Sequence, residues 1–311
     1  MQIKLTKTAG FCWGVKRAID IALKLARQDN QKPVYTYGPL AHNPQVIKFL
    51  EEKGIKAIKN IEGISSGTLI IRSHGISPQE QKKLEKSGLK IVDATCPRVK
   101  AVQLTIGKHI DEGYHIIIMG DKKHPEVIAL LGFAGEKGDV VISAREVNEL
   151  HVSGKICLVA QTTQSEAEFE AISKIAKKKF PDIKIINTIC DSARIRQEEI
   201  KNLAQSVDAI IIVGGKDSGN TKVLVKIARS ANAPTFHLAG KKEIDPLKML
   251  KYRSIGVAAG ASTPDWVIKD IVNKLSSLDS LQTAPAVNGS ATKTLRHEEK
   301  NGSAQSRQGL K

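Results

Sequence analysis

The sequence predicts an α/β protein made of three similar small α/β units arranged around a pseudo-threefold axis. Three segments share one pattern: an apolar strand-like run, a short turn with threonine, a cysteine and then a helix. They are IKLTKTAGFCWGVKRAIDIALKLA, LKIVDATCPRVKAVQLTIGKHI and IKIINTICDSARIRQEEIKNLA, which begin at Ile3, Leu89 and Ile183. The cysteines recur after 84 and then 94 residues, a period too long for a solenoid and suited to small α/β units.

Helical spacing is clearest in the first segment. Its apolar residues recur at the intervals of one buried helix face. These residues are Val15, Ala18, Ile19, Ala22, Leu23 and Ala26. Each unit is therefore predicted to run from a strand through its cysteine into a helix.

Two further polar positions recur after each cysteine. His42, His124 and Asn220 follow the three cysteines by 30, 28 and 30 residues. His74, Thr162 and Ser262 follow them by 62, 66 and 72 residues, again after apolar strand-like runs. Polar residues at such positions are often simple caps. Nine in register favour a shared site, because ligands bind at the carboxyl ends of strands in open α/β sheets.

Composition bounds the function. The chain of 311 residues is 41% hydrophobic and 26% charged, which suits a globular protein with a core. Its start has no apolar signal-peptide segment and no apolar stretch is long enough to span a bilayer, so a cytoplasmic protein without a membrane role is expected. The formal net charge of +16 suits an anionic ligand or an acidic partner. Only 4% of residues are aromatic, which disfavours nucleic-acid binding.

The cysteines indicate a metal site. Cys157, in the strand-like KICLVA, is predicted to be a buried apolar residue. Cys12, Cys96 and Cys190 precede predicted helices, whose N-termini favour thiolates. Three converging thiolates repel one another unless they bind a metal. Zinc with an open position and a [4Fe–4S] cluster with one open iron both remain possible from the spacing.

The remaining polar positions indicate an anion site with one acid. Neutral or weakly basic donors near helix starts suit a phosphate or diphosphate. These donors are His42, His74, Ser218, Asn220 and Ser262. GGKDSGNTK lacks the ending of a Walker A loop. Glu126 follows His124-Pro125 and could deliver a proton; alternatively it is an ordinary first-turn acid.

The motifs together resemble one family. GFCWGVKRAI, AHNP, SHG, DATCP, HPEV, QTT, the late Cys190, SGNTK and GAS are similar, in this order over about residues 1–278, to the motifs of the 4-hydroxy-3-methylbut-2-enyl diphosphate reductases. These enzymes end the methylerythritol phosphate route to isoprenoids. The resemblance implies a trefoil of three α/β domains around one [4Fe–4S] cluster per chain, held by Cys12, Cys96 and Cys190. It implies reductive removal of the substrate hydroxyl, bound at the open iron, to give isopentenyl and dimethylallyl diphosphate.

The resemblance also implies residue roles. Glu126 is then the proton source, Thr162 contacts the substrate hydroxyl or a water, and His124 lines the pocket. The diphosphate is then held by His42, His74, Ser218, Asn220 and Ser262. Gly219 stands where some members carry a second serine, and its backbone N–H could serve instead. Reduced ferredoxin or flavodoxin is the implied electron donor, and the basic surface suits such acidic proteins.

The repeat sets the expected domain limits. They are 1–96, 97–190 and 191–280, with residues 1–13 able to pack against the third domain and a disordered tail over 281–311. A monomer or weak homodimer is expected. Two other functions compete with the reductase: a zinc hydrolase or lyase acting on a small phosphorylated substrate, and an RNA-binding protein with a structural metal. The few aromatic residues and the lack of an RNA-binding module disfavour the second.

Overall fold

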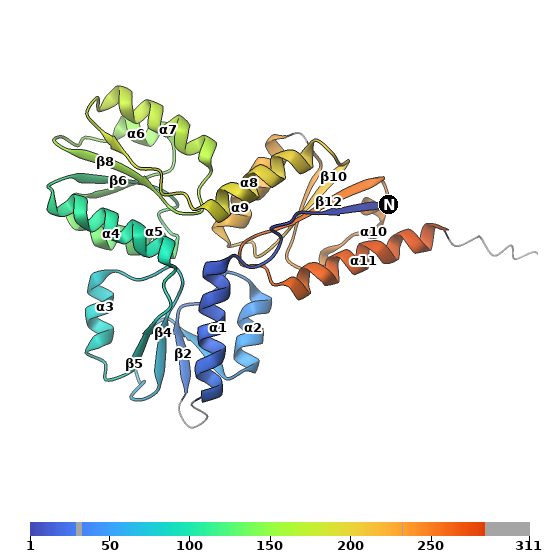
Figure 1. Cartoon of the computed structure of the whole chain (residues 1–311), viewed down its shortest axis with the longest axis horizontal. Coiled ribbons are helices and arrows are strands. Elements are labelled where there is room, and N and C mark those ends of the chain that lie inside the picture. The colour runs from blue at the N-terminus through green and yellow to red at the C-terminus, as the bar shows by residue number, and fades with distance from the viewer. Residues whose placement is uncertain (29–32, 232, 284–311) are drawn as a thin grey trace, which may run out of the picture.

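The protein consists of three α/β lobes that meet at a common centre (Figure 1). The computed structural model describes residues 1–28, 33–231 and 233–283. Each lobe is built on a four-stranded parallel sheet. The predicted fold class, three similar α/β units around a pseudo-threefold axis, is thereby confirmed.

The strands of each sheet are short. The first sheet contains β2 (Val34–Tyr37), β3 (Ile55–Ile58), β4 (Thr68–Ile71) and β5 (Lys90–Asp93). The second contains β6 (His115–Met119), β7 (Gly138–Val141), β8 (Ile156–Ala160) and β9 (Lys184–Ile185). The third contains β1 (Gln2–Leu5), β10 (Ala209–Val213), β11 (Thr235–Leu238) and β12 (Ser254–Ala259).

All three sheets share one strand order. The orders are β3-β2-β4-β5, β7-β6-β8-β9 and β11-β10-β12-β1. In the third sheet the N-terminal strand β1 takes the edge that β5 and β9 take in the other two, pairing with β12 from Gln2↔Ser254 to Leu5↔Val257. The chain then leaves this sheet and enters the first lobe through α1 (Trp13–Gln28), the blue helix of Figure 1. The direction in which successive strands are added reverses between β2 and β4, between β6 and β8, and between β10 and β12. Folds of this kind bind ligands at such points.

Helices cover both faces of each sheet. The first sheet packs against α1, α2 (Pro44–Glu52) and α3 (Pro78–Glu85). The second carries α4 (Pro97–Asp111), α5 (Pro125–Ala134), α6 (Ala144–Glu149) and α7 (Glu166–Lys179), with a 3₁₀ turn at Gly135–Lys137. The third carries α8 (Asp191–Ala204), α9 (Gly219–Ser230), α10 (Pro246–Met249) and α11 (Asp265–Thr283), with a 3₁₀ turn at Lys241–Glu243.

The central strands explain why the sequence shows unbroken apolar runs. Every residue of β10 and all of β6 except His115 are buried. A parallel sheet covered on both faces needs apolar side chains on both, so its strands do not alternate. Each sheet accordingly has one hydrophobic core on each face. Cys157 lies fully buried in β8 in one of these cores, as predicted.

Two further expectations concern the C-terminal tail and membrane-spanning segments. Helix α11 continues to Thr283, slightly into the stretch predicted to be a disordered tail, and the rest of that stretch, 284–311, lies outside the described residues. Among the residues that are described, none of the helices combines the length and the apolar character needed to cross a bilayer.

Candidate functional site

One cavity of about 640 Å³ lies where the three lobes meet. It is lined by every residue that the sequence singles out as a site candidate: Cys12, His42, His74, Cys96, His124, Glu126, Thr162, Cys190, Ser218, Gly219, Asn220 and Ser262. Nine of them follow strands in equivalent places of the three sheets: β2, β4 and β5 in the first, β6, β8 and β9 in the second, and β10, β12 and β1 in the third. Equal topology thus brings three sets of three to one place. The structure thus brings the candidates together and leaves none of them elsewhere.

Helix N-termini aim backbone N–H groups at this cavity. His124 caps α5 and accepts a hydrogen bond from the Glu126 N–H through Nδ1 at 3.2 Å. The Sγ atom of Cys190 caps α8 by accepting from Ala193 N at 3.4 Å, and Cys12 Sγ accepts from Val15 N at 3.5 Å. Ser218 caps α9. Converging N-termini favour negative charge in the space between them.

Burial disfavours the charged form of two of the site thiols. Burial raises the pKa of Cys190 to about 11, against the opposing hydrogen bond from Ala193. Burial also raises the pKa of Cys96, against the N–H groups of Arg98 and Val99. For these two residues, with no cation bound, desolvation of the charged form outweighs the hydrogen bonds from the N–H groups. A bound cation is needed to favour the thiolates.

Gly14 makes room for these thiols. A Cβ atom at this position would lie 2.6 Å from Cys96 Sγ and 4.0 Å from Cys12 Sγ. The first distance is far below van der Waals contact, so α1 approaches Cys96 this closely only because residue 14 has no side chain. Sequence analysis missed this residue, although a glycine inside a predicted helix often marks such a close approach.

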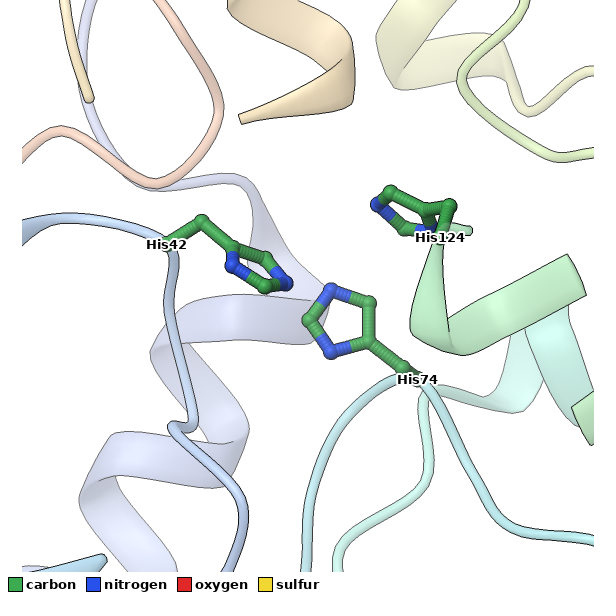
Figure 2. Close-up of side chains that lie close together, drawn as sticks. All are labelled: His42, His74 and His124. Atoms are coloured by element: carbon green, nitrogen blue, oxygen red, sulfur yellow. The ribbon is translucent and has the colours of Figure 1, made fainter. Parts of the chain in front are cut away.

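Three histidines form a second part of the cavity, named here the histidine trio: His42, His74 and His124. Their ring centroids are 4.9, 5.6 and 5.2 Å apart. They come from separate segments and turn their rings toward one another (Figure 2). One ring nitrogen of each lies within 4.8 Å of the others, a spacing that could also hold a metal ion.

The trio is neutral near pH 7. Burial lowers the pKa of His124 to about 4, with a further contribution from His42. Burial also lowers the pKa of His74 well below its usual value and that of His42, where Arg72 adds to the effect. Each ring therefore carries one N–H donor and one acceptor nitrogen.

Several polar atoms at this end of the cavity have no partner among the described residues. They are His42 Nε2, His74 Nδ1 and Asn220 Nδ2. Buried polar atoms are nearly always hydrogen-bonded in a working protein, so such atoms point to a ligand that completes them. The charges of Arg72 and Lys222 act on His42 and His124, and those of Asp217 and Asp121 oppose them. The unpartnered donors at this end of the cavity suit an anion.

Glu126 is a buried carboxylate in the cavity, whereas Asp191, the other carboxylate that lines it, pairs with Arg98 and Arg194. Glu126 is 2% exposed, and its carboxylate accepts from Thr162 N at 2.7 Å and from Thr162 Oγ1 at 2.9 Å. Burial raises the pKa of Glu126 to about 7, and the two Thr162 bonds oppose this. An ordinary solvated first-turn acid would not show this burial. A carboxyl group with a pKa near neutral can both give and receive a proton.

Arg196 also lines the cavity and was missed from the sequence. It lies on the buried face of α8, in line with Ala193 and Ile200. The helical spacing of this segment already places Arg196 on the buried face of the helix, and a charged residue there could have been recognised as a site candidate from the sequence.

Comparisons with known proteins agree with this site. The LytB protein family matches residues 3–276. The chain is 41% identical over 279 residues to the 4-hydroxy-3-methylbut-2-enyl diphosphate reductase of Pelobacter propionicus, covering 90% of this chain and 99% of the relative. It is 41% identical over 282 residues to the enzyme of that name from Aquifex aeolicus, covering 89% of this chain and 97% of the relative.

Solved structures give the same result. The chain superposes on the E-1-hydroxy-2-methyl-but-2-enyl-4-diphosphate reductase of Plasmodium falciparum with a TM-score of 0.84 at 31% identity, covering 88% of this chain and 87% of that one. Another structure, of (E)-4-hydroxy-3-methyl-but-2-enyl diphosphate reductase, gives a TM-score of 0.66 at 40% identity, covering 89% and 100%. The chain therefore belongs to the LytB family of 4-hydroxy-3-methylbut-2-enyl diphosphate reductases, which confirms the resemblance that its motifs indicated.

Proposed function

We propose that this protein reduces 4-hydroxy-3-methylbut-2-enyl diphosphate to isopentenyl and dimethylallyl diphosphate, with one [4Fe–4S] cluster held by Cys12, Cys96 and Cys190. In the overall reaction a C–O bond breaks, a C–H bond forms, and two electrons and two protons enter as the hydroxyl leaves as water. The observation that carries the proposal is the meeting of three thiols, a buried acid and three neutral histidines on one cavity. Membership of a reductase family disfavours the zinc hydrolase and RNA-binding hypotheses.

The donor set fits an iron–sulfur cluster. Three cysteine sulfurs, the usual ligands of iron–sulfur clusters, line the same cavity. When bound, a [4Fe–4S] cluster would supply single electrons and one open iron for the substrate hydroxyl.

Gly14→Ala is expected to prevent cluster assembly, because the new Cβ would overlap Cys96 Sγ. Iron per chain after anaerobic reconstitution measures the effect, and we expect less than about a tenth of the wild-type content in a folded protein. Gly107→Ala is the matched control. Gly107 also lies in a helix, α4, and a Cβ there meets nothing within 4 Å. Equal iron contents in the two variants would contradict the role assigned to Gly14.

The substrate diphosphate is proposed to lie against the histidine trio, Ser218, Gly219, Asn220 and Ser262. The unpartnered donors there support this placement. Ser262 Oγ already lies 3.3 Å from Ser218 Oγ, so both hydroxyls face one spot. Gly219 offers a backbone N–H at the first position of α9. A Cβ at Gly219 would lie 3.3 Å from His124 Nε2, so a serine there would require a small shift of the His124 ring.

His74→Phe is expected to weaken the binding of inorganic pyrophosphate about tenfold or more, since a hydrogen bond to a charged group contributes about 1.5–3 kcal/mol. Titration calorimetry of the cluster-loaded protein in metal-free buffer measures this. Anion binding favours protonated histidines, so wild-type affinity should rise as the pH falls. His115→Gln is the control, because His115 pairs with Asp139 away from the cavity. Equal affinities for all three proteins, or binding only after a divalent metal is added, would contradict the assignment.

Glu126 is proposed to be the proton source and Thr162 the group that orients it. Their two hydrogen bonds support this pairing. His124 joins them by presenting its Nδ1 to the Glu126 N–H. The cavity walls exclude bulk water from this acid, which keeps its proton available for the substrate. We also propose that Thr162 Oγ1 contacts the substrate hydroxyl or a water.

The remaining expectations are proposals of the same kind. We propose domain limits of 1–96, 97–190 and 191–280, reduced ferredoxin or flavodoxin as electron donor, cytoplasmic location, and a monomer or weak homodimer. The sheets support the limits, because two are formed within them and the third borrows β1. The function itself is tested by anaerobic assay with dithionite-reduced viologen and the diphosphate substrate. Formation of both isomeric products supports it, and no turnover by cluster-loaded protein refutes it.

A further inference from the structure

Arg196 is a buried cation beside the thiols. It is 6% exposed and lies on α8 facing the cavity. Its Nη2 donates to the Gly10 carbonyl at 3.0 Å, and its Nη1 donates to the Ser192 carbonyl at 3.1 Å and to the Ser192 hydroxyl. Gly10 precedes Cys12 and Ser192 follows Cys190. The guanidinium therefore ties together the two backbone segments that carry these cysteines.

Arg196 has no carboxylate partner in the described part of the chain. The charge of Glu199 acts on it, but the Glu199 carboxylate accepts from the Thr8 N–H and hydroxyl and forms no ion pair with Arg196. The Nε atom of Arg196 is buried without a partner. A buried, unpaired charge is strongly unfavourable, so a compensating negative charge is expected close by.

The thiolates of Cys12 and Cys190 would supply that charge once they hold the cluster. Burial lowers the pKa of Arg196, and negative charge on Cys12 and then on Cys190 is the largest opposing influence. An arginine side chain keeps its proton at any working pH. The positive charge of Arg196 therefore belongs to the thiolate end of the cavity and not to a surface ion pair.

We propose that Arg196 is a positioning residue whose fixed charge raises the reduction potential of the cluster held by Cys12, Cys96 and Cys190; this inference rests on the proposed function. Reduction adds one electron, taken from a one-electron donor, to a group that already bears thiolate charge. A fixed cation in a region of low dielectric stabilises the reduced form more than the oxidised form. The guanidinium itself gains and loses no electron or proton.

The test is a redox titration of anaerobically reconstituted protein, with mediators, followed by visible absorbance and electron paramagnetic resonance. Arg196→Gln removes the charge, and Arg196→Lys keeps it while losing the planar set of donors. Arg194→Gln is the matched control, since Arg194 is on the same helix but exposed and paired with Asp191. At a fixed ambient potential, Arg196→Gln should lower the ratio of reduced to oxidised cluster about tenfold or more, equivalent to about 59 mV for a one-electron couple. Arg196→Lys and Arg194→Gln should match the wild type.

Three outcomes separate the possible failures. A complete cluster with an unchanged midpoint in Arg196→Gln overturns the inference while leaving the proposed function intact. If Arg196→Gln assembles no cluster, Arg196→Lys alone decides: a wild-type midpoint supports the charge, and a clearly lowered one shows that the bonds to Gly10 and Ser192 matter instead. A wild-type protein without iron and sulfide would overturn the proposed function, and this is measured first.

Discussion

Replacing Glu126 with Gln is expected to lower kcat by about 10²-fold or more while cluster content and substrate binding remain, because general-acid groups contribute about 10²- to 10⁴-fold. Gln preserves the shape of the side chain but carries no transferable proton. The pH profile gives a second signature. The pKa of Glu126 is raised to about 7, so the protonated, donating form dominates below this pH and is lost as the pH rises through it. The variant should lack this alkaline decline.

Anaerobic steady-state kinetics across pH 6 to 9 test the assignment, with roughly this range chosen to bracket the pKa. Thr162→Val is the companion variant, since it removes only the hydroxyl that donates to the Glu126 carboxylate at 2.9 Å. Losing that bond should raise the pKa of Glu126 and move the decline to higher pH. Near-normal turnover of Glu126→Gln, or an unchanged alkaline decline in it, would remove Glu126 as the proton source.

Replacing Cys96 with Ser is expected to abolish both cluster assembly and turnover. A serine hydroxyl is a poor substitute for a thiolate as an iron ligand. The cavity is lined by three cysteines, so the variant would retain only two thiol ligands. Cys157→Ser is the control, because Cys157 lies fully buried in β8 outside the cavity. It should keep the cluster and turnover, with some loss of thermal stability from a buried hydroxyl.

Iron content, sulfide content and turnover measured on both variants test whether Cys96 is a cluster ligand and Cys157 a core residue. If the two substitutions have the same effect on all three quantities, the division between ligand and core cysteines is wrong. Melting temperatures of the two proteins separate loss of the cluster from loss of the fold.

The fold was largely predictable because each of its three units shows the same local sequence pattern. Strand-like runs followed by a cysteine and an apolar helical face appear in all three segments. The pairing of β1 with β12 spans nearly the whole chain. Local sequence patterns do not determine a contact between such distant segments, so this strand pairing could not be predicted with certainty from the sequence.

The candidate site was predictable as a set of positions but not as an electrostatic environment. Parallel strands bring residues after their carboxyl ends together, so spacing alone grouped Cys12, His42 and His74 with the rest of the nine positions. Protonation depends on burial, which spacing does not reveal. The raised pKa of Cys190 and the neutral histidine trio follow from desolvation in the folded cavity. Arg196 escaped notice because its bond to the Gly10 carbonyl joins residues that lie far apart in the sequence.

The central claim is that three cysteines from three similar units hold one redox cluster. Anaerobic purification, iron and sulfide analysis and an absorption spectrum test it most directly. We predict brown protein with roughly four irons and four sulfides per chain, the stoichiometry of a [4Fe–4S] centre. Colourless protein that holds stoichiometric zinc under strict anaerobiosis would contradict the claim.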